Sequence, residues 1–308
     1  MPPSSIAPPA PAAGARCGYR NAVLTGACGG LGQALARTLL AQGAQVALLG
    51  LDRSVLDALA AQAPGRCRVY VLDVSDAQAM QRAAQDWLAH AGLPDLVIAN
   101  AGVAGGFDTA EADDLPVMRR MLEINLLGPA TTFQPFVQAL RHAPGQRCAL
   151  VGVASIAGWR GLPGNGAYCA SKGGLIRYLQ SLRAELRGSR ISVHTVCPGY
   201  LRTALTAGNR FSMPGLMEPQ AAAEALLAAV ARGRAHIVLP RRTGWLARLL
   251  GCLPDALHDR VLTRQPRKPR VGQAGATVIP GLAPHPTRDS ARPAARDTRQ
   301  EPAQAPAP

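Results

Sequence analysis

The stretch Thr25-Gly26-Ala27-Cys28-Gly29-Gly30-Leu31-Gly32 decides the fold. It lies between a short apolar run, Asn21–Thr25, and a segment with apolar residues at helical spacing, 31–42, which Gly43 ends. Residues without a side chain let backbone N–H groups and a helix N-terminus approach a pyrophosphate. A purely structural turn would also explain the glycines. Their position between a first strand and an amphipathic helix favours a dinucleotide-binding turn.

Outward from this turn, apolar strand-like runs alternate with helical patterns. Further strands are expected at 45–49, 67–72, 95–99, 148–153, 190–196 and 236–239. Helices are expected at 54–62, 76–91, 113–142, 168–187 and 219–231, with Gly128-Pro129 interrupting the longest. This alternation predicts an α/β fold, a single Rossmann-type doubly wound parallel sheet with helices on both faces. The uninterrupted apolar centres of the strands fit a sheet covered on both sides.

The two ends of the chain differ from this core. Residues 1–18 are mostly Pro, Ala, Ser and Gly, and residues 263–308 are rich in Pro, Arg and Ala. Such segments bury too little apolar surface to offset the entropy of ordering them. We therefore expect a disordered N-terminal segment (1–18), one catalytic domain (19–262) and a disordered tail (263–308).

The formal net charge is +14, which raises the question of a nucleic-acid partner. Residues 264–308 account for about +5 of it, and the remaining arginines are scattered without a basic stripe. Only Lys172 and Lys268 are lysines among the 33 basic residues. A solvated basic surface explains the charge, with weak attraction to anionic membranes or polyanions as the alternative. No specific nucleic-acid partner is expected.

The seven cysteines are odd in number, widely spaced and without a CxxC pair. This usage indicates reduced thiols rather than a disulfide framework or a metal site. The N-terminus lacks a basic region followed by an apolar one, and no apolar run is long enough to span a bilayer. These features predict a cytoplasmic protein.

The end of the second strand, Leu49-Gly50-Leu51-Asp52-Arg53, bears on the nucleotide. Asp52 could hydrogen-bond an adenosine ribose, or cap the helix that begins near Ser54. Arg53 could reach a 2′-phosphate or be solvated. No acid ends the strand directly, so this region leaves the choice between NAD and NADP open.

Tyr168 and Lys172 are four residues apart at the start of a helix, so both project from one face. A tyrosine has an unperturbed pKa of about 10, and a nearby cation favours the phenolate that acid–base catalysis needs. This spacing is common by chance. Ser155 strengthens the catalytic interpretation of Tyr168 and Lys172, because Ser155 ends the preceding strand at the edge where parallel sheets bind ligands. Asn125 is a polar residue within an apolar helix, which a satisfied buried amide would also explain.

These residues resemble the short-chain dehydrogenase/reductase family over about residues 19–240. The TGxxxGxG turn corresponds to Thr25–Gly32, and the family's Asn-Asn-Ala-Gly motif to 99–102, with Ala99 in place of the first Asn. The remaining matches are Asp73-Val74 after the third strand, the Asn125, Ser155, Tyr168 and Lys172 tetrad, Pro198-Gly199 after the sixth strand, and Thr203. Six motifs in the family's order and spacing make the resemblance specific.

The resemblance implies a role for each member of the tetrad. Tyr168 would be the general acid/base and Ser155 would orient the substrate oxygen. Lys172 would bind the nicotinamide ribose and lower the pKa of Tyr168. Asn125 would hold a water that links Lys172 to solvent.

The resemblance also implies the cofactor site. The expected contacts are Thr25, Gly26, Gly30, Leu31, Gly32, Asp52, Asp73, Val74, Asn100, Ala101, Gly102, Tyr168, Lys172, Pro198, Gly199 and Thr203. The positions that carry a basic residue in NADP-dependent members are Gly29 and Leu51 here, and Gly50 replaces the acid that marks NAD use. Because no acid at Gly50 would repel a 2′-phosphate, NADP is slightly favoured over NAD.

The segment 200–218 would cover the substrate in such a protein. It contains Leu201, Leu205, Phe211, Met213, Leu216 and Met217. An apolar alcohol or ketone would suit this lining, although the same residues could simply pack the segment onto the domain. Residues 245–253 form a basic amphipathic stretch that could meet a membrane surface, another subunit or its own domain.

We therefore expect an NAD(P)-dependent oxidoreductase that interconverts a secondary alcohol and a ketone, as a homodimer or homotetramer. The alternative is a catalytically silent NAD(P)-binding regulatory or scaffold protein on the same fold. The intact tetrad favours the enzyme, because a cofactor sensor needs only the nucleotide turn.

Overall fold

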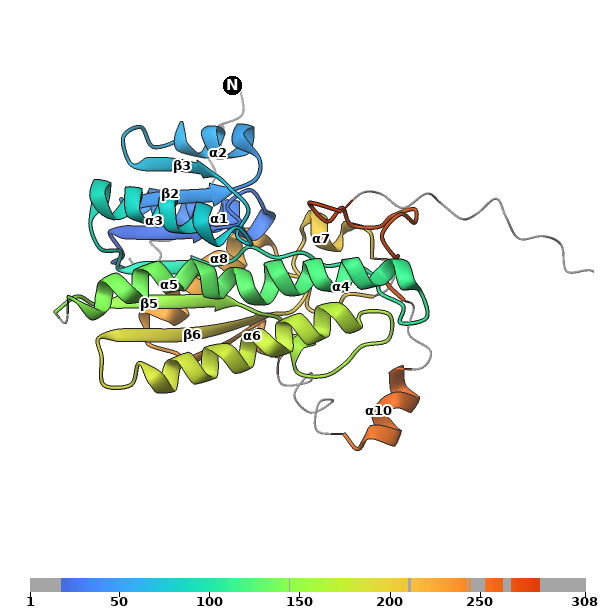
Figure 1. The fold of residues 1–308 in the computed structure, drawn as a ribbon. Coiled ribbons are helices and arrows are strands. Elements are labelled where there is room, and N and C mark those ends of the chain that lie inside the picture. The colour runs from blue at the N-terminus through green and yellow to red at the C-terminus, as the bar shows by residue number, and fades with distance from the viewer. Residues whose placement is uncertain are drawn as a thin grey trace, which may run out of the picture.

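The computed structural model describes residues 18–143, 145–209, 212–242, 244, 253–262 and 267–282. Their centre is a seven-stranded parallel sheet in the order β3-β2-β1-β4-β5-β6-β7 (Figure 1). The strands are β1 Asn21–Thr25, β2 Gln45–Gly50, β3 Cys67–Val71, β4 Leu96–Ala99, β5 Cys148–Val153, β6 Ile191–Pro198 and β7 His236–Leu239. The predicted doubly wound sheet is confirmed. Its strand order reverses between β1 and β4, where such sheets bind ligands.

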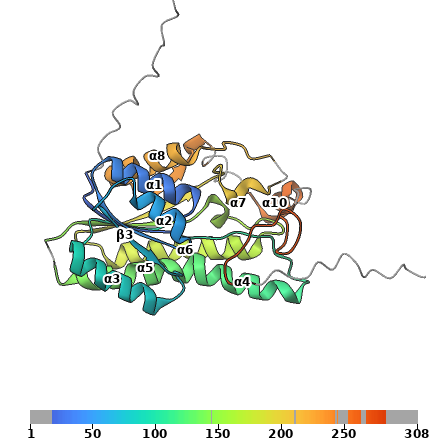
Figure 2. The same ribbon diagram turned by 90° about the horizontal axis from the view of Figure 1, so that it is seen from above.

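Helices cover both faces of the sheet (Figure 2). One layer holds α1 Gly30–Ala41, α2 Arg53–Ala60 and α8 Pro219–Ala231. The other holds α3 Ala77–Ala91, α4 Leu115–Leu122, α5 Gly128–Arg141 and α6 Gly166–Glu185. The shorter helices α7 Ala204–Ala207 and α10 Asp255–Leu262 lie beyond the carboxyl ends of the strands.

The long helical region expected at 113–142 is interrupted five residues earlier than its Gly-Pro pair indicated. α4 ends at Leu122, and a π-helical turn, Glu123–Leu127, leads into α5. Pro129 is accommodated in the first turn of α5, where its missing N–H would have no partner in any case. A π turn contains one extra residue, and such turns are frequent at functional sites. Asn125 lies within it.

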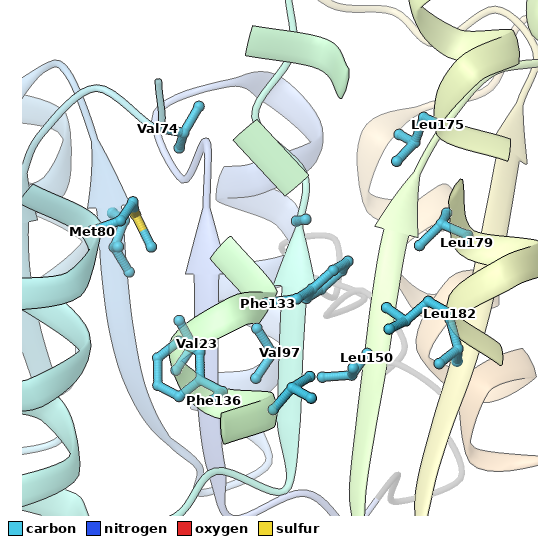
Figure 3. Close-up of a cluster of buried hydrophobic side chains, with 14 of the residues drawn as sticks. Val23, Val74, Met80, Val97, Phe133, Phe136, Leu150, Leu175, Leu179 and Leu182 are labelled. Carbon is cyan, nitrogen blue, oxygen red and sulfur yellow. The ribbon is translucent and has the colours of Figure 1, made fainter. Parts of the chain in front are cut away.

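The hydrophobic core has two parts because neighbouring residues of each strand point to opposite faces. Val23 of β1 faces the α3–α6 layer, whereas Leu24 faces α1 and α8. In Figure 3, Phe133 of α5 lies beside β4 and Phe136 lies beside Val23, and both rings are almost fully buried. Burying a side chain of this size stabilises the fold by roughly 1.5–3 kcal/mol.

The chain beyond α10 differs from expectation. Residues 267–282 lie along the domain rather than forming a disordered tail. Ile279 is 1% exposed within the core cluster of the α3–α6 layer, and Arg270 pairs with the buried carboxylate of Asp114. Periodicity did not reveal this segment, because long-range contacts hold it without a helix or strand. The tail predicted from residue 263 therefore does not describe 267–282.

Three sequence predictions fall wholly or in part on segments without a described structure. Residues 1–17 of the N-terminal segment, 245–252 of the amphipathic stretch, and 263–266 and 283–308 of the tail lie outside the described residues. Among the residues that are described, no helix has the length and apolar character needed to cross a membrane.

Candidate active site

One cleft at the carboxyl ends of the strands collects residues from most of the chain. Most of the residues that the sequence assigned to the site line it together. These are Gly26, Gly30, Leu31, Gly32, Asp73, Val74, Asn100, Ala101, Gly102, Ser155, Tyr168, Lys172, Pro198, Gly199 and Thr203. The predicted nucleotide turn and the predicted proton-transfer residues thus line one cleft.

The glycine turn depends on close backbone approach. Gly26 has φ +65°, and a Cβ there would lie 2.6 Å from the Cα of Ala101. A Cβ on Gly32 would lie only 2.0 Å from the carbonyl oxygen of Gly26. Because neither backbone atom can yield like a flexible side chain, only glycine fits these two positions.

The N-terminus of α1 opens into the cleft without a side-chain cap. Gly29 precedes the helix and supplies no capping oxygen. The backbone N–H groups at the start of α1 therefore point toward the cleft with the positive end of the helix dipole. This arrangement fits a bound pyrophosphate. The helix start also lies close to Thr203, since a Cβ on Gly30 would lie 2.7 Å from Thr203 Cγ2.

Thr25 braces the turn from behind instead of lining the cleft. Its side chain is buried, and its Oγ1 accepts hydrogen bonds from the backbone N–H groups of Asn100 (3.1 Å) and Ala101 (3.3 Å). The Asn100 amide donates back to the carbonyl oxygens of Thr25 and Gly26. These bonds hold the loop after β4 against the glycine turn.

Asp52 also lies outside the residues that line the cleft. Its carboxylate caps α2, accepting hydrogen bonds from Ser54 Oγ (2.7 Å) and Val55 N (3.2 Å). These bonds, that from Ser54 first, lower the pKa of Asp52. The sequence left Asp52 either a ribose contact or a helix cap, and the structure shows the helix cap. At Gly50, a Cβ would lie 2.5 Å from Cys28 Sγ, so the thiol occupies the space beside this strand end.

Asp73 lines the cleft and is held by a residue that the sequence analysis missed. The guanidinium of Arg120, on α4, forms an ion pair with Asp73 and donates to Ser75 Oγ at 2.8 Å. Asp73 Oδ1 also accepts from the backbone N–H of Ser75. Burial alone would raise the pKa of Asp73, but the bonds from Ser75 and Arg120 outweigh it and lower that pKa.

Ser155, Tyr168 and Lys172 meet at the end of β5. Ser155 is 8% exposed, its hydroxyl accepts from Ala157 N, and it hydrogen-bonds Tyr168. Lys172 is 4% exposed, donates to the carbonyl of Val153 at 2.9 Å, and lies 6.0 Å from the centre of the Tyr168 ring. The sequence spacing alone did not show that the two hydroxyls and the ammonium share one buried corner.

Burial dominates the electrostatics of this corner. It raises the pKa of Tyr168 to about 12, and the hydrogen bond with Ser155 offsets part of that rise. It also lowers the pKa of Lys172 to about 8, because a buried ammonium loses its hydration. At neutral pH Tyr168 is thus a phenol and Lys172 remains mostly protonated.

Asn125 is fully buried, and its amide is hydrogen-bonded. Its Oδ1 accepts from Val103 N (2.8 Å), and its Nδ2 donates to Val103 O and Ser171 Oγ. A Cβ on Gly102 would approach both Asn125 Oδ1 (3.2 Å) and Lys172 Nζ (3.1 Å). Gly102 thus keeps open the space between the amide and the ammonium.

The apolar segment after β6 divides between two tasks. Leu201 and Leu205 line the cleft, and Leu201 also belongs to the core on the α1–α8 side, against which Met217 packs. Phe211 lies outside the described residues. Packing onto the domain is therefore observed for part of the segment, and contact with a substrate stays a prediction.

Several lining residues escaped the sequence analysis. They are Leu72, Val103, Ile124, Thr206 and Pro280. The first three directly neighbour motif residues, so a wider window around each motif would have found them. Nothing local points to Pro280, which reaches the cleft from the far end of the chain.

A family model described as short chain dehydrogenase matches residues 20–212 of this chain. The chain belongs to the short-chain dehydrogenase family. A relative from Myxococcus xanthus named "Uncharacterized oxidoreductase" is 38% identical over 255 residues, covering 81% of this chain and 99% of that protein. The chain is an oxidoreductase of this family.

Two solved short-chain dehydrogenase structures share the fold. One, from Burkholderia cenocepacia in complex with NADP, has a TM-score of 0.69 and 27% identity and covers 81% of this chain and 99% of its own. The other, from Burkholderia phymatum in complex with NAD, has a TM-score of 0.68 and 25% identity and covers 81% and 97%.

Proposed function

We propose that this short-chain dehydrogenase interconverts a secondary alcohol and a ketone with NAD(P), and that Tyr168 is the general acid/base. The observation that carries the proposal is the buried corner of Ser155, Tyr168 and Lys172 in the same cleft as the glycine turn. A fold that only sensed the nucleotide would need the turn but not this corner.

Ser155, Tyr168 and Lys172 have different proposed roles in proton transfer. When bound, a nicotinamide supplies or accepts the hydride. The Ser155 hydroxyl is placed to hold the substrate oxygen, since it is fixed at the strand end and already bonds Tyr168. Tyr168 is a phenol at neutral pH and can donate its proton to the oxygen of a ketone undergoing reduction. In the opposite direction, the Lys172 cation stabilises the phenolate that receives the proton.

Asn125 holds the residues around this corner in place through hydrogen bonds. Its amide fixes the loop at Val103 and, through Ser171, the backbone of Tyr168, because Ser171 Oγ donates to the Tyr168 carbonyl at 2.8 Å. We propose that a water in the space beside Gly102 connects Lys172 with Asn125 and solvent. A proton lost from Tyr168 could then be replaced through Lys172.

The proposed substrate is apolar around the reacting carbon. Val103, Ile124, Leu201 and Leu205 supply apolar lining near the proton-transfer corner. Few polar side chains remain there to recognise a specific hydrogen-bonding substrate.

The proposed cofactor is NADP or NAD, with NADP slightly favoured. The two Burkholderia relatives bind one each. At the end of β2, the Cys28 thiol fills the space where an acidic side chain on Gly50 would begin. Asp73 is the residue of the cleft lining that carries a carboxylate, and its ion pair with Arg120 offsets the negative charge that would repel a phosphate.

The decisive experiment is a screen of apolar ketones and secondary alcohols with NADH, NADPH and their oxidised forms, following nicotinamide absorbance. Turnover with the full chain and its loss in Tyr168→Phe would support the proposal. Cofactor binding without turnover on any substrate would instead indicate the silent regulatory protein. Near-normal turnover by Tyr168→Phe would disprove the assigned proton donor.

We also propose a cytoplasmic homodimer or homotetramer. Leu115 and Leu127 are 61% and 56% exposed on the outer side of the α4–α5 region, and a second copy could cover them. Light scattering after size-exclusion chromatography measures the subunit number, and a monomer at micromolar concentration would contradict it. Cell fractionation tests the location.

A further inference from the structure

Residues 267–282, called the strap below, cross the mouth of the catalytic cleft. At one side the strap's backbone pairs with the loop after β4, where Gly106 N donates to Pro269 O at 3.0 Å. At the other it touches α7, since Lys268 Nζ donates to the carbonyl of Leu205 (3.1 Å). Figures 1 and 2 both place this dark red segment beside α7 and near α4. The strap therefore connects the two rims of the cleft.

Side chains anchor the strap on α4 and the turn before it. Arg270 forms a two-pronged ion pair with Asp114 (2.8 and 3.2 Å), whose side chain is 1% exposed, and also contacts Glu111. Ile279 is buried where a Cβ on Gly105 would meet it at 3.1 Å. A bidentate pair with a buried carboxylate and a buried aliphatic side chain indicate a docked segment rather than a loose tail.

The far end of the strap forms part of the cofactor cleft. Pro280 lines it together with Asp73 and Val74. Arg120 joins the two, because its Nε donates to the carbonyl of Pro280 (2.8 Å) while its terminal nitrogens hold Asp73 and Ser75. Gly281 has φ +82°, and a Cβ there would crowd the same guanidinium at 3.2 Å.

We propose that the strap is a wall of the dinucleotide site in its own chain, and that Arg120 is the positioning residue coupling strap docking to cofactor binding. The inference rests on the proposed NAD(P) binding. One guanidinium holds both Asp73 and the strap carbonyl, so a dinucleotide that fixes Asp73 also fixes Arg120, and through it Pro280. Docking in turn completes the wall at Pro280. Each event therefore stabilises the other, as linkage requires.

Trypsin provides a direct measure of strap docking in the full chain. The bond between Arg270 and Val271 is cleavable only when the Arg270 guanidinium leaves Asp114. Mass spectrometry would follow this single bond with and without saturating NADPH and, in parallel, NADH. We expect the bound dinucleotide to slow cleavage by about tenfold, the effect of one charge-assisted hydrogen bond. Equal rates with and without a cofactor that binds would overturn the proposal.

Variants of α4 separate positioning from general stability. Arg120→Met removes the link between Asp73 and Pro280, and Arg119→Met is the matched control, an exposed arginine on the same helix. We expect Arg120→Met to raise the cofactor KM about tenfold with a smaller change in kcat, and to abolish NADPH protection of the Arg270–Val271 bond. If Arg120→Met keeps that protection, Arg120 does not couple the two sites.

Truncation tests the wall itself. A chain ending after Leu282 should bind NADPH like the full chain, measured by nicotinamide fluorescence. A chain ending after Leu262 should bind it about tenfold more weakly or not at all. Circular dichroism reports whether the shorter chain folds; if it does not, the full-length variants decide. Failure of the full chain to bind either cofactor would refute the proposed function, whereas equal binding by a folded chain without the strap would refute only the strap.

Discussion

The glycine turn and the strap line the same cleft but are held in different ways. The turn, Thr25–Gly32, uses backbone atoms in close approach to one another and to the adjacent loop after β4. The strap is held at separate points along its length: a backbone hydrogen bond from Gly106 N to Pro269 O, the ion pair of Arg270 with Asp114, and the bond from Arg120 to the Pro280 carbonyl. A part in which backbone atoms pack closely over its whole length resists opening, whereas a segment held at a few separate points can detach as a unit. The cleft thus combines a rigid floor with a separable wall.

The proposed proton-transfer corner lies in the same cleft, and its loss should have the largest effect. Tyr168→Phe removes the transferred proton but keeps the ring, and kcat should fall by about 10²–10⁴-fold with cofactor binding unchanged. Tyr178→Phe, on the same helix but away from the cleft, should retain activity. Steady-state kinetics and nicotinamide fluorescence provide the two measurements. A small loss in Tyr168→Phe would place the proton donor elsewhere.

The rigidity of the turn can be tested with one methyl group. In Gly32→Ala the new Cβ would lie 2.0 Å from the Gly26 carbonyl oxygen, whereas in Gly29→Ala the nearest atom would be 3.5 Å away. Overpacking of this kind costs about 1–3 kcal/mol, so Gly32→Ala should lower the Tm and lose cofactor binding. Gly29→Ala should bind nearly normally. Similar behaviour of the two variants would show that the turn is not rigid.

The pH dependence of the two reaction directions should differ. Burial raises the pKa of Tyr168 to about 12, so the phenol is the main form at neutral pH. Alcohol oxidation needs the phenolate, whose fraction rises by about tenfold per pH unit below that pKa. The rate of oxidation should therefore climb from about pH 6 to about pH 7.5, where Lys172, whose pKa burial lowers to about 8, still carries its charge, while ketone reduction, which uses the phenol, should not rise. Initial rates in both directions test this. A falling oxidation rate would contradict it.

The smallest expected effect is at the strap. Arg270→Met leaves the buried Asp114 without its cationic partner, although Asp108 N still donates to it, and should weaken strap docking by about 1–3 kcal/mol, with little change in global stability. Arg267→Met breaks a more exposed pair with Asp108 and should cost about 0–1 kcal/mol. Native-state hydrogen exchange of the strap amides measures both. Equal effects would mean that the Asp114 pair does not anchor the strap.

Local pattern predicted some elements closely and missed others for identifiable reasons. β1, β5, α8 and β7 begin and end where periodicity placed them. The break in the long helix appears at Glu123–Leu127 because a π turn there places Asn125 against Val103, a tertiary contact that the Gly-Pro signal does not encode. The sequence left the role of Asp52 undecided between a ribose contact and a helix cap. The observed hydrogen bonds from Ser54 and Val55 are those of a helix cap.

The sequence by itself determined the sheet, the glycine turn and the spacing of Tyr168 and Lys172, because these depend on residue type and on contacts close along the chain. Only the tertiary structure decided which side chains meet. It placed Arg120 on Asp73, set Ser155 beside Tyr168 in a buried corner, and brought Pro280 to the cleft. Ion pairs and buried aliphatic contacts between distant residues leave no periodic trace, so a segment whose composition resembles a disordered tail became a wall of the site.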